Sequence, residues 1–569
     1  MYILGINPSI DAATSLLDEK NIIAAVSEER FERKKHLRAF PLQSLKYCLE
    51  AGKIKMSDIK AAAVCWNPGI HLDHLSILRG GNFRHYSELL IHIPYYLLKE
   101  SNLKPASNST SSYVKQEFIF KDKKNPLEIY YINHHLSHAA SAFFLSPYKN
   151  AAILTIDGYG EETSGLMAVA KKNNINPVKE LFFPHSIGSI YAAITQYLGF
   201  TPNQDEGKVM GLSAWGKPAY YSKLKKIIKV LPGGDIELDL SYFSFYMERH
   251  IRVSQKFTDE FGPAKFFNEP ITGRHKNLAS SLQKIISEVV CQLAYILYEK
   301  TGEKNLCLAG GVALNCGING ILRNRLPFKN IFVPPAPGDD GNSLGAALYL
   351  KHIILGYPKI NYPEKVYLGT DFENKKIKEM LSRCNVDYLE CKNPEKKAAE
   401  LLAQNKIIGW FLDRMEFGPR ALGNRSILAH PGGEKVKERL DYKIKKRAEF
   451  RPYAPSILKE KYSLFFKENV DSPYMSFCSE VLQEQREKIK QVVHKDGTAR
   501  VQIVDNKINS KFYLIIKEFE KLSGLPLVLN TSLNTHHQPI VNTPEEALQL
   551  FFTTDLDAIF LGKYLIRKN

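Results

Sequence analysis

The 569-residue sequence predicts an α/β fold with a duplicated first part, followed by a second α/β region of different texture. Apolar segments at residues 2–6, 13–17 and 22–26, separated by turn-forming residues, predict a strand, a turn and two further strands. Residues 151–184 repeat this order, and each copy leads into helical sequence. A repeat of this kind predicts two similar half-domains.

Between the two copies, residues 67–125 are irregular and rich in aromatic, His and Ser residues, so we expect an inserted segment that is partly helical. Apolar positions on one face predict a long helix at about residues 277–300, with Gly302 at its end. Residues 305–315 predict a strand that enters a glycine turn and then a helix, and residues 332–347 repeat that order.

A linker rich in Pro, Tyr and Lys runs from about residue 356 to 365, and the sequence texture changes after it. Residues 407–411 predict a strand, which an arginine-rich loop and alternating short strands and helices follow. A chain of this length is expected to hold two or three domains. We therefore expect one domain at residues 1–355 and another at residues 366–569.

The composition excludes several classes of protein. Hydrophobic residues make up 44% and charged residues 24%, as in water-soluble globular proteins. No segment approaches the about 18 consecutive apolar residues of a membrane span, and the N-terminus lacks the basic and apolar regions of a signal peptide. The cysteines include no CxxC pair, which argues against a structural zinc site or a disulfide framework. These features predict a cytoplasmic protein.

The formal net charge is +17, and such a basic balance suits nucleic acid, a membrane surface or phosphorylated substrates. The basic residues are spread along the chain, with local runs at residues 223–229 and 443–447. We therefore favour a solvated lysine-rich surface over a nucleic-acid interface, and we expect no nucleic-acid partner.

Two histidines one helical turn apart, His134 and His138, form the first candidate site. A spacing of four residues places both imidazoles on one helix face, and Asp157 ends the apolar strand that follows. Two imidazoles and a carboxylate can bind a divalent metal, although a histidine pair at this spacing also arises often by chance. His135 points off that face, which indicates a supporting or structural role.

Glycine turns that carry Asp or Asn end several predicted strands, at residues 5–7, 157–160, 310–315 and 339–341. Three such turns in a duplicated fold form the pattern of an actin-like ATPase core, in which two turns hold the nucleotide phosphates and a third faces the adenosine. The fold predicted for residues 1–355 is therefore a duplicated actin-like core with an inserted segment.

The C-terminal part concentrates arginines in loops stiffened by glycine and proline, at residues 416–426 and 447–456, with Arg500 further along. Rigid guanidinium groups bind phosphates and carboxylates in bidentate fashion. Anion binding is therefore favoured over a purely structural network of salt bridges.

Five motifs carry a resemblance to a known family: residues 134–138 (HHLSH), 157–161 (DGYGE), 207–212 (GKVMGL), 309–312 (AGGV) and 338–341 (GDDG). They resemble the N-terminal domain of antibiotic and nodulation-factor O-carbamoyltransferases, which is similar to the transferase that makes threonylcarbamoyl-adenosine in tRNA. The resemblance implies that His134, His138, Asp157 and Asp339 bind an Fe(II)-like divalent metal. It also implies nucleotide contacts from Asp157, Gly158, Gly160, Lys208, Gly211, Gly310, Gly311, Val312 and Asn315.

The region after the linker resembles the second domain of the same family, which is related to the YrdC-like carbamoyl-AMP-forming fold. That resemblance implies ATP and carbamoyl phosphate as co-substrates, Mg(II) with the ATP, and carbamoyl adenylate as the intermediate. The residues implied for phosphate or carbamoyl binding are Lys35, Arg420, Arg447, Arg451, Arg500, Asn530 and Ser532. Asp11 is a candidate contact for the transfer step.

Two positions depart from the family pattern. Ile10 stands where the family commonly has a histidine near the adenylate site, and Gln538 stands where it often has a glutamate. Neither departure removes an expected metal ligand or a motif arginine.

These features predict an ATP-dependent O-carbamoyltransferase of natural-product type, which transfers a carbamoyl group to a hydroxyl of a small-molecule or saccharide acceptor and releases AMP. A tRNA threonylcarbamoyl-type modification enzyme, which the +17 charge would favour, is one alternative. A non-catalytic actin-like nucleotide-binding regulator is another. The sequence indicates neither the acceptor nor the oligomeric state.

Overall fold

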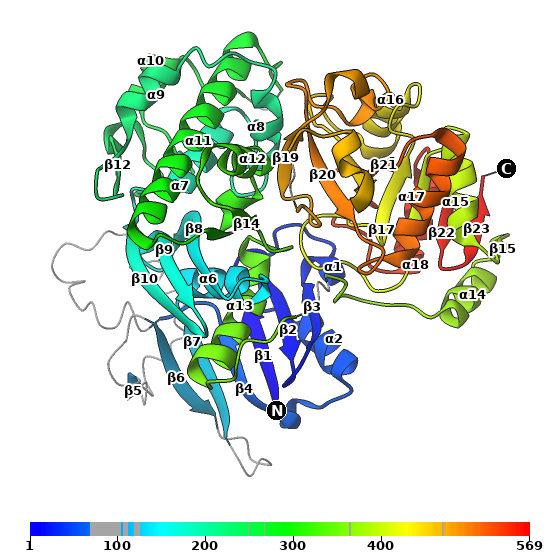
Figure 1. The fold of residues 1–569 in the computed structure, drawn as a ribbon, viewed down its shortest axis with the longest axis horizontal. Helices are drawn as coiled ribbons and strands as arrows, with labels where there is room; N and C mark the ends of the chain where they lie inside the picture. The colour runs from blue at the N-terminus through cyan, green and yellow to red at the C-terminus, as the bar shows by residue number, and fades with distance from the viewer. Residues whose placement is uncertain are drawn as a thin grey trace. The chain divides into compact units, whose positions relative to one another are not determined.

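The computed structural model describes residues 1–68, 104–105, 112–118, 126–248, 250–266, 268–362, 366–468 and 471–568 (Figure 1). The chain divides into two compact units. Unit 1 holds residues 1–25 and 38–362, and unit 2 holds residues 26–37 and 363–569. Most of the insertion predicted at residues 67–125 lies outside the described residues.

Unit 1 contains a seven-stranded sheet in the order β3-β2-β1-β4-β7-β6-β5. Strand β1 pairs antiparallel with β2 and parallel with β4, and β4 pairs parallel with β7. Its strands are β1 (Tyr2–Asn7), β2 (Ala13–Leu17), β3 (Ile22–Ser27), β4 (Ile59–Val64), β5 (Lys104–Pro105), β6 (Tyr113–Phe118) and β7 (Leu127–Ile132).

A second sheet of unit 1 has the order β10-β9-β8-β13-β14, with β8 antiparallel to β9 and parallel to β13. Strands β9, β8, β13 and β14 thus repeat the order and the relative directions of β2, β1, β4 and β7. The strands are β8 (Asn150–Gly160), β9 (Thr163–Lys171), β10 (Asn174–Phe182), β13 (Asn305–Ala309) and β14 (Asn330–Phe332). A short hairpin joins β11 (Ile228–Val230) to β12 (Ile236–Leu238).

The helices of unit 1 include two that pack tightly together, α6 and α13. Gly345 permits this, because a Cβ at that position would lie 2.0 Å from the carbonyl oxygen of Ser137. The helices are α2 (Leu42–Gly52), α6 (His134–Leu145), α7 (Ile187–Tyr197), α8 (Glu206–Ser213), α9 (Tyr221–Ile227), α10 (Gln255–Phe261), α11 (Gly273–Thr301), α12 (Cys316–Arg325) and α13 (Asn342–Tyr349). The long predicted helix corresponds to α11, and Gly302 ends it in the left-handed conformation as expected.

Unit 2 is built on a nine-stranded sheet in the order β15-β23-β22-β16-β17-β21-β18-β20-β19. The predicted strand at 407–411 is confirmed as β16. The strands are β15 (Leu389–Glu390), β16 (Ile408–Phe411), β17 (Arg425–Ala429), β18 (Ala454–Leu458), β19 (Phe477–Glu480), β20 (Thr498–Val504), β21 (Leu527–Ser532), β22 (Ala558–Leu561) and β23 (Tyr564–Arg567). The helices are α1 (Glu29–Glu32), α14 (Asn374–Arg383), α15 (Pro394–Ala403), α16 (Val436–Glu438), α17 (Ser510–Ser523) and α18 (Pro544–Thr553).

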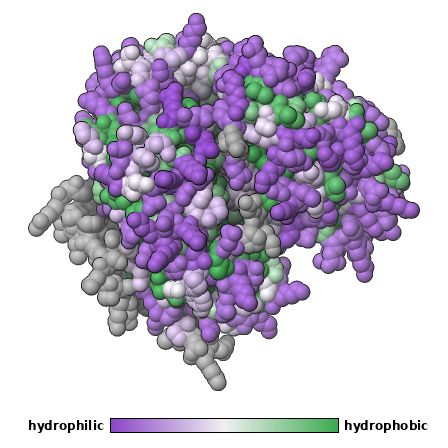
Figure 2. Space-filling model, in the orientation of Figure 1, coloured by the Kyte–Doolittle hydropathy of each residue, from purple (hydrophilic) through white to green (hydrophobic). Residues whose placement is uncertain are grey.

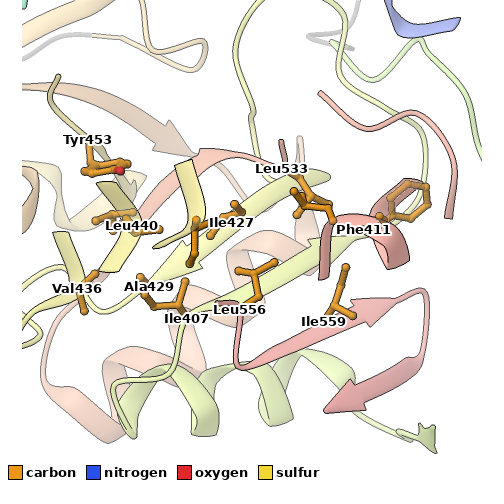
Figure 3. Packing of buried hydrophobic residues seen from close by; sticks show 14 of the residues in the cluster. Ile407, Phe411, Ile427, Ala429, Val436, Leu440, Tyr453, Leu533, Leu556 and Ile559 are labelled. Carbon is orange, nitrogen blue, oxygen red and sulfur yellow. The ribbon is translucent and has the colours of Figure 1, made fainter. Parts of the chain in front are cut away.

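The two faces of the unit 2 sheet differ. One face carries alternate apolar residues of β17, β18, β20 and β21 into a large core, part of which Figure 3 shows. The opposite face is apolar where α15 and α17 cover Leu428, Leu458, Val504 and Val528. Toward the other end of the same strands this face becomes polar, with Ser456, Gln502 and Asn530 joined by hydrogen bonds.

The fold is therefore mixed α/β with several sheets, as predicted. The face of the molecule seen in Figure 2 is mainly hydrophilic, with hydrophobic residues in separate small areas. In the described part of the chain, no helix is both long enough and apolar enough to cross a membrane.

Candidate functional site

Helix α6 places His134 and His138 on one face, and its start is fixed by polar contacts. The Asn133 side chain accepts a hydrogen bond from the backbone N–H of Leu136 at 3.0 Å, as an N-cap. The buried Glu161 carboxylate accepts the N–H of His134 at 3.0 Å and that of Asn67 at 2.7 Å. These contacts set where the helix begins, and hence which way both imidazoles point.

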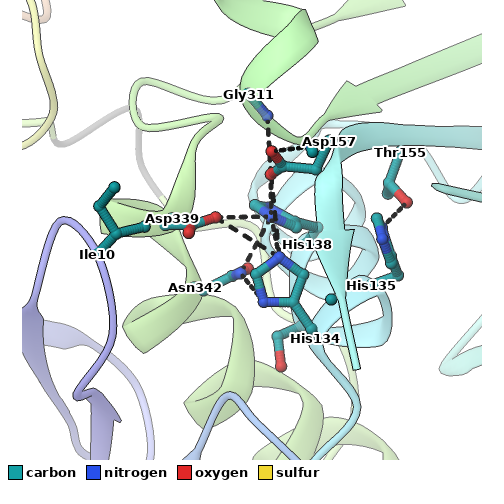
Figure 4. A network of polar contacts seen from close by, with 12 residues as sticks. Ile10, His134, His135, His138, Thr155, Asp157, Gly311, Asp339 and Asn342 are labelled. Atoms are coloured by element: carbon teal, nitrogen blue, oxygen red, sulfur yellow. Dashed lines mark hydrogen bonds and ion pairs between the residues drawn. The ribbon is translucent and has the colours of Figure 1, made fainter. Parts of the chain in front are cut away.

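Four side chains converge at this helix: His134, His138, Asp157 and Asp339 (Figure 4). The Nε2 atoms of the two histidines lie 3.1 Å apart. Nε2 of His138 lies 3.2 Å from Oδ2 of Asp157 and 3.4 Å from Oδ1 of Asp339. The four donor atoms all lie within 4.8 Å of one another. The structure therefore brings together all four residues that the resemblance implied as metal ligands.

The Asp157 carboxylate is held by backbone donors from two glycine turns. The N–H of Gly158 donates to Oδ1 at 2.6 Å, and the N–H of Gly311 donates to Oδ2 at 3.0 Å. Burial raises the pKa of Asp157, but the two neighbouring imidazoles outweigh it and hold that pKa well below its usual range. The carboxylate is thus a fixed anion.

Asp339 differs, because burial and the charge of Asp157 raise its pKa well above the usual range. Among the described residues, its Oδ1 atom is buried and makes no hydrogen bond. Two carboxylates that repel each other, with an unsatisfied oxygen and two imidazoles at this spacing, fit a divalent cation. Nitrogen and oxygen donors of this kind suit iron, manganese or zinc.

Asn342 and Asn7 support this cluster, and the sequence analysis did not select either as a site residue. Nδ2 of Asn342 lies 3.3 Å from Nδ1 of His134 and 3.1 Å from Nε2 of His138. The Asn7 amide donates to the backbone carbonyls of Ile10, Asp11 and Asp339, at 2.9, 3.2 and 2.9 Å. A signal for Asn7 existed in the sequence, since it stands in a glycine turn at the end of a predicted strand.

Asp11 and Ile10 lie in the turn that Asn7 holds. Asp11 adopts a left-handed backbone conformation with φ of 54°, which non-glycine residues seldom take. Figure 4 shows Ile10 on the Asp339 side of the cluster. The turn therefore borders the candidate metal centre, as the expectation for Asp11 requires.

His135 lies outside the cluster. Its ring is within hydrogen-bonding distance of Oγ1 of Thr155, at 2.9 Å, and of the carbonyl of Thr163, at 3.3 Å, so it points away from the metal ligands (Figure 4). Gly160 gives His134 its space, because a Cβ there would lie 2.3 Å from the imidazole ring.

The candidate nucleotide residues follow two neighbouring parallel strands. Asp157, Gly158 and Gly160 belong to the end of β8, while Gly310, Gly311, Val312 and Asn315 follow the end of β13. Gly310 has φ of 86°, and its Cβ would lie 2.2 Å from the carbonyl oxygen of Ile156. Both turns thus meet at one edge of the sheet.

Lys208 and Gly211, two further candidates of this group, lie on α8. Among the candidates, Lys208 and Asn315 bind other side chains of the protein. Nζ of Lys208 is 2.8 Å from Oδ2 of Asp205, and it lies 5.7 Å from the ring centroid of Phe200. The Asn315 side chain accepts from the N–H of Ile318 and exchanges hydrogen bonds with Gln283.

Unit 2 contains a second candidate site, centred on a buried lysine that the sequence analysis missed. Lys445 is 2% exposed, so treating the run at 443–447 as solvated surface was wrong for this residue. Its ammonium donates to the backbone carbonyls of Ser532 and Asn534 and to Oδ1 of Asn534. Burial, followed by the charges of Arg447, Lys35 and Arg451, lowers the pKa of Lys445 well below its usual range.

The cations near Lys445 include three of the residues predicted for anion binding. Lys35 donates to the backbone carbonyl of His536 at 2.8 Å, and Nη1 of Arg451 lies 3.0 Å from Nδ1 of His536. Arg447 is paired with Asp441 at 3.2 Å and stacks on the ring of Tyr453. Such a collection of positive charge favours a polyanionic ligand.

Lys35 reaches this cluster because residues 26–37 belong to unit 2. Arg30 donates to the carbonyl of Gly418 at 2.9 Å. Arg33 donates to the carbonyls of Ile540 and Pro539, at 2.8 and 2.9 Å, and lies 3.3 Å from Glu546. This segment is thus fastened by guanidinium groups whose positions the sequence alone did not indicate.

The loop that carries Arg420 folds around a buried acid, Glu416, which is 2% exposed. Its Oε1 accepts backbone N–H groups of Leu422, Asn424 and Arg425, at 2.6, 3.3 and 3.3 Å. A single carboxylate that accepts several backbone donors rigidifies a loop. Glu416 therefore fixes the loop that carries Arg420. This structural role of Glu416 was not predicted from the sequence.

Asn530, Ser532 and Arg500 share the polar face of the unit 2 sheet. Asn530 and Ser532 are two residues apart on β21, and Asn530 pairs in register with Ala454 of β18. Arg500 stands two residues before Gln502, which pairs with Ser456 of the parallel strand β18. Arg500 and Asn530 therefore lie in one row, on either side of the small side chain of Ala454.

Comparison with known proteins gives matches over most of the chain. The family model for the carbamoyltransferase N-terminus matches residues 2–348, and the model for the carbamoyltransferase C-terminus matches residues 399–568. The nodulation protein NolNO of Sinorhizobium fredii is 36% identical over 569 residues, which covers 98% of this chain and 79% of that protein.

Two other relatives align over nearly the full length. The uncharacterized protein sll1178 of Synechocystis sp. is 35% identical over 600 residues, covering 100% of this chain and 97% of that protein. Nodulation protein U of Rhizobium tropici is 26% identical, covering 94% and 91%. Among solved structures, HypF of T. kodakarensis has a TM-score of 0.31 at 12% identity, over 62% of this chain and 48% of that chain, too low for any argument.

Proposed function

We propose a function from one premise, that the chain belongs to the carbamoyltransferase family and is a transferase enzyme. The protein would be an ATP-dependent O-carbamoyltransferase with two active sites. The domain at residues 366–569, YrdC-like in fold, would make carbamoyl adenylate. The domain at residues 1–355, an actin-like core, would transfer the carbamoyl group to an acceptor hydroxyl.

The observation that carries this proposal is the cationic cluster around Lys445 beside the polar sheet face of unit 2. The charges of Arg447, Lys35 and Arg451 act on the buried Lys445, and Arg447 is paired with Asp441. Collecting like charges in a partly buried place costs stability unless an opposite charge binds there. The polyphosphate of ATP and the phosphate of carbamoyl phosphate would supply that charge.

Unit 2 would form carbamoyl adenylate in two steps. Water cleaves carbamoyl phosphate to carbamate and inorganic phosphate. A carbamate oxygen then bonds to the α-phosphorus of ATP, and pyrophosphate leaves. Arg420, Arg451 and Lys35 would hold phosphate oxygens through charge-assisted hydrogen bonds, while Mg(II) accompanies the ATP. The product, carbamoyl adenylate, has AMP as a good leaving group.

In unit 1, the oxygen of an acceptor hydroxyl would attack the carbamoyl carbon, the bond from that carbon to the AMP phosphate oxygen would break, and AMP and the hydroxyl proton would be released. His134, His138, Asp157 and Asp339 would hold an Fe(II)-like ion, which when bound supplies Lewis acidity. Gly158 and Gly311 fix the Asp157 carboxylate through their N–H groups. The turns of Gly158, Gly160, Gly310, Gly311 and Val312 would contact the nucleotide, with Lys208, Gly211 and Asn315 on neighbouring elements. Asp11, in the turn beside the cluster, would contact the acceptor.

The test uses the purified full chain with Fe(II) and Mg(II). We expect pyrophosphate release that requires both ATP and carbamoyl phosphate, and a mass gain of one carbamoyl group on some member of a panel of hydroxylated small molecules and saccharides. Omission of either co-substrate is the control. Absence of pyrophosphate release with both co-substrates present would contradict the proposal, whichever acceptor is used.

A further inference from the structure

The polar face of the unit 2 sheet extends beyond Arg500 to His494, which the candidate residues of the sequence did not include. Side chains alternate along β20, so Ala499, Val501 and Ile503 enter the core cluster while Thr498, Arg500 and Gln502 share the opposite face. His494 precedes the strand, and its Nδ1 lies 3.1 Å from Oγ1 of Thr498. The His494 ring is therefore attached to the same face as Arg500.

The hydrogen-bond chain around His494 fixes its tautomer. The Thr498 hydroxyl donates to Oδ1 of Asp496 at 2.7 Å, a stronger and closer acceptor than an imidazole nitrogen at 3.1 Å. The Thr498 oxygen is then left to accept, so the hydrogen of the imidazole stands on Nδ1. Nε2 therefore carries a bare lone pair, and this atom is buried with no hydrogen-bond partner among the described residues.

Two more polar atoms of this face lack partners in the described part of the chain: Oδ1 of Asn530 and Nε of Arg500. The orientation of the Asn530 amide is set, because its Nδ2 donates to the carbonyl of Ala421 and to Oε1 of Gln502. The Gln502 amide is set in turn by donating to the carbonyl of Leu422. The Asn530 oxygen is thus an acceptor, like Nε2 of His494, while Nε of Arg500 is a donor.

A ligand that satisfies these three atoms must carry hydrogen-bond donors as well as an acceptor. The phosphate groups of ATP and of an acyl phosphate are largely ionised at neutral pH, so they can satisfy Arg500 but leave both acceptors unpaired, which is costly for buried groups. A carbamoyl group has an NH2 with two donors and a carbonyl acceptor. Arg500 and Asn530 lie about 10 Å apart at their Cα atoms, two strand spacings across Ala454, so side chains from both can reach one small group.

We propose that His494 is a further substrate-binding residue of unit 2, whose Nε2 accepts a hydrogen bond from the NH2 of the carbamoyl group. The inference rests on the proposed function and adds the residue that distinguishes a carbamoyl group from an acyl group without N–H. Burial, followed by the charge of Arg500, lowers the pKa of His494 to about 4, which keeps the lone pair free at neutral pH.

The experiment compares carbamoyl phosphate with acetyl phosphate, in which CH3 replaces NH2. Pyrophosphate release gives the KM for carbamoyl phosphate, and calorimetry gives the Kd of each acyl phosphate. In His494→Ala we expect both constants for carbamoyl phosphate to rise about 10-fold, the value of one lost hydrogen bond, while the Kd for acetyl phosphate changes less than about twofold. His494→Gln, which keeps an acceptor, should recover part of the loss.

A matched pair of variants at Thr498 distinguishes the proposed role of His494 in binding the carbamoyl group from a general loss of structure. Thr498→Ser keeps the hydroxyl that orients the imidazole and should behave like the wild type, whereas Thr498→Val should weaken carbamoyl phosphate binding selectively. Equal weakening of both acyl phosphates in His494→Ala, or a rise confined to the KM for ATP, would overturn the inference and leave the proposed function standing. A wild type that releases no pyrophosphate with carbamoyl phosphate would overturn both.

Discussion

The candidate sites of the two units concentrate charges of opposite sign. In unit 1, Asp157 and Asp339 lie together beside two imidazoles, and Oδ1 of Asp339 is buried without a hydrogen bond in the described part of the chain. In unit 2, Lys445 is buried among Lys35, Arg447 and Arg451. Each arrangement concentrates one sign of charge at a cost in stability, which supports the proposal that each site binds a ligand of the opposite sign. The proposed ligands are a cation in unit 1 and phosphates in unit 2.

The two sites also differ in what holds them. The candidate ligands of unit 1 stand on α6, on β8 and in the short 3-10 turn before α13, and backbone N–H groups orient Asp157. The cations of unit 2 stand on loops, at the end of a π-helical turn and on one half of a sheet face, and the carboxylate of Glu416 orders one of those loops. Rigid elements suit a metal, which needs fixed donor positions. Loops suit a substrate that must enter and leave.

The largest effect is expected from Arg420→Ala in unit 2. Loss of a guanidinium that stabilises transferring phosphates should lower ATP- and carbamoyl phosphate-dependent pyrophosphate release by about 100-fold or more, effectively abolishing AMP formation. Bound Fe(II), measured by mass spectrometry of the metal, should stay at the wild-type level, because the cation site belongs to unit 1. Unchanged pyrophosphate release would remove Arg420 from the proposed site.

The reciprocal change in unit 1 is His138→Ala. We expect loss of one donor of four to lower Fe(II) affinity by at least about 10-fold, and to abolish carbamoyl transfer to the acceptor. Pyrophosphate release should continue, since adenylation is assigned to unit 2. If the metal-checked variant transfers the carbamoyl group at the normal rate, the assignment of this cluster to a catalytic metal is wrong.

A smaller effect, on stability, is expected at His352, which lies in unit 1 away from the metal ligands. The buried imidazole is within hydrogen-bonding distance of the carbonyl of Tyr357 and the hydroxyl of Tyr362, and stacks on Phe144 of α6. Burial lowers the pKa of His352 to about 4. In the unfolded chain the His352 imidazole takes up a proton near pH 6.5, whereas in the folded chain it does so only near pH 4. The free energy of unfolding should therefore fall by about 3 kcal/mol as the pH falls from 6.5 toward 4.

His352→Gln keeps polar contacts without titrating, so its free energy of unfolding should fall less steeply between pH 6.5 and pH 4. Urea unfolding can be followed in a Trp410→Phe background, in which the remaining tryptophans, Trp66 and Trp215, both report on unit 1. Parallel pH profiles for the variant and its parent would show that His352 does not titrate in this way.

Much of the fold could be read from periodicity and turn residues. Helix α11 follows from its apolar face and Gly302, and β16 follows from an apolar run of strand length. In the site of unit 1, the four ligand positions came from spacing and motif resemblance. The supporting residues Asn342 and Glu161 could not be assigned in this way, because their partners are far away in the sequence or act through the backbone.

By itself, the sequence determined the mixed α/β class, the family resemblance and the identities of His134, His138, Asp157 and Asp339, because local propensity and motif spacing are properties of neighbouring residues. Only the tertiary structure decided that Lys445 is buried, although a lysine run reads as solvated surface, and that His494 shares a face with Arg500. Burial and the pairing of distant strands depend on how the whole chain packs, and no local pattern encodes them.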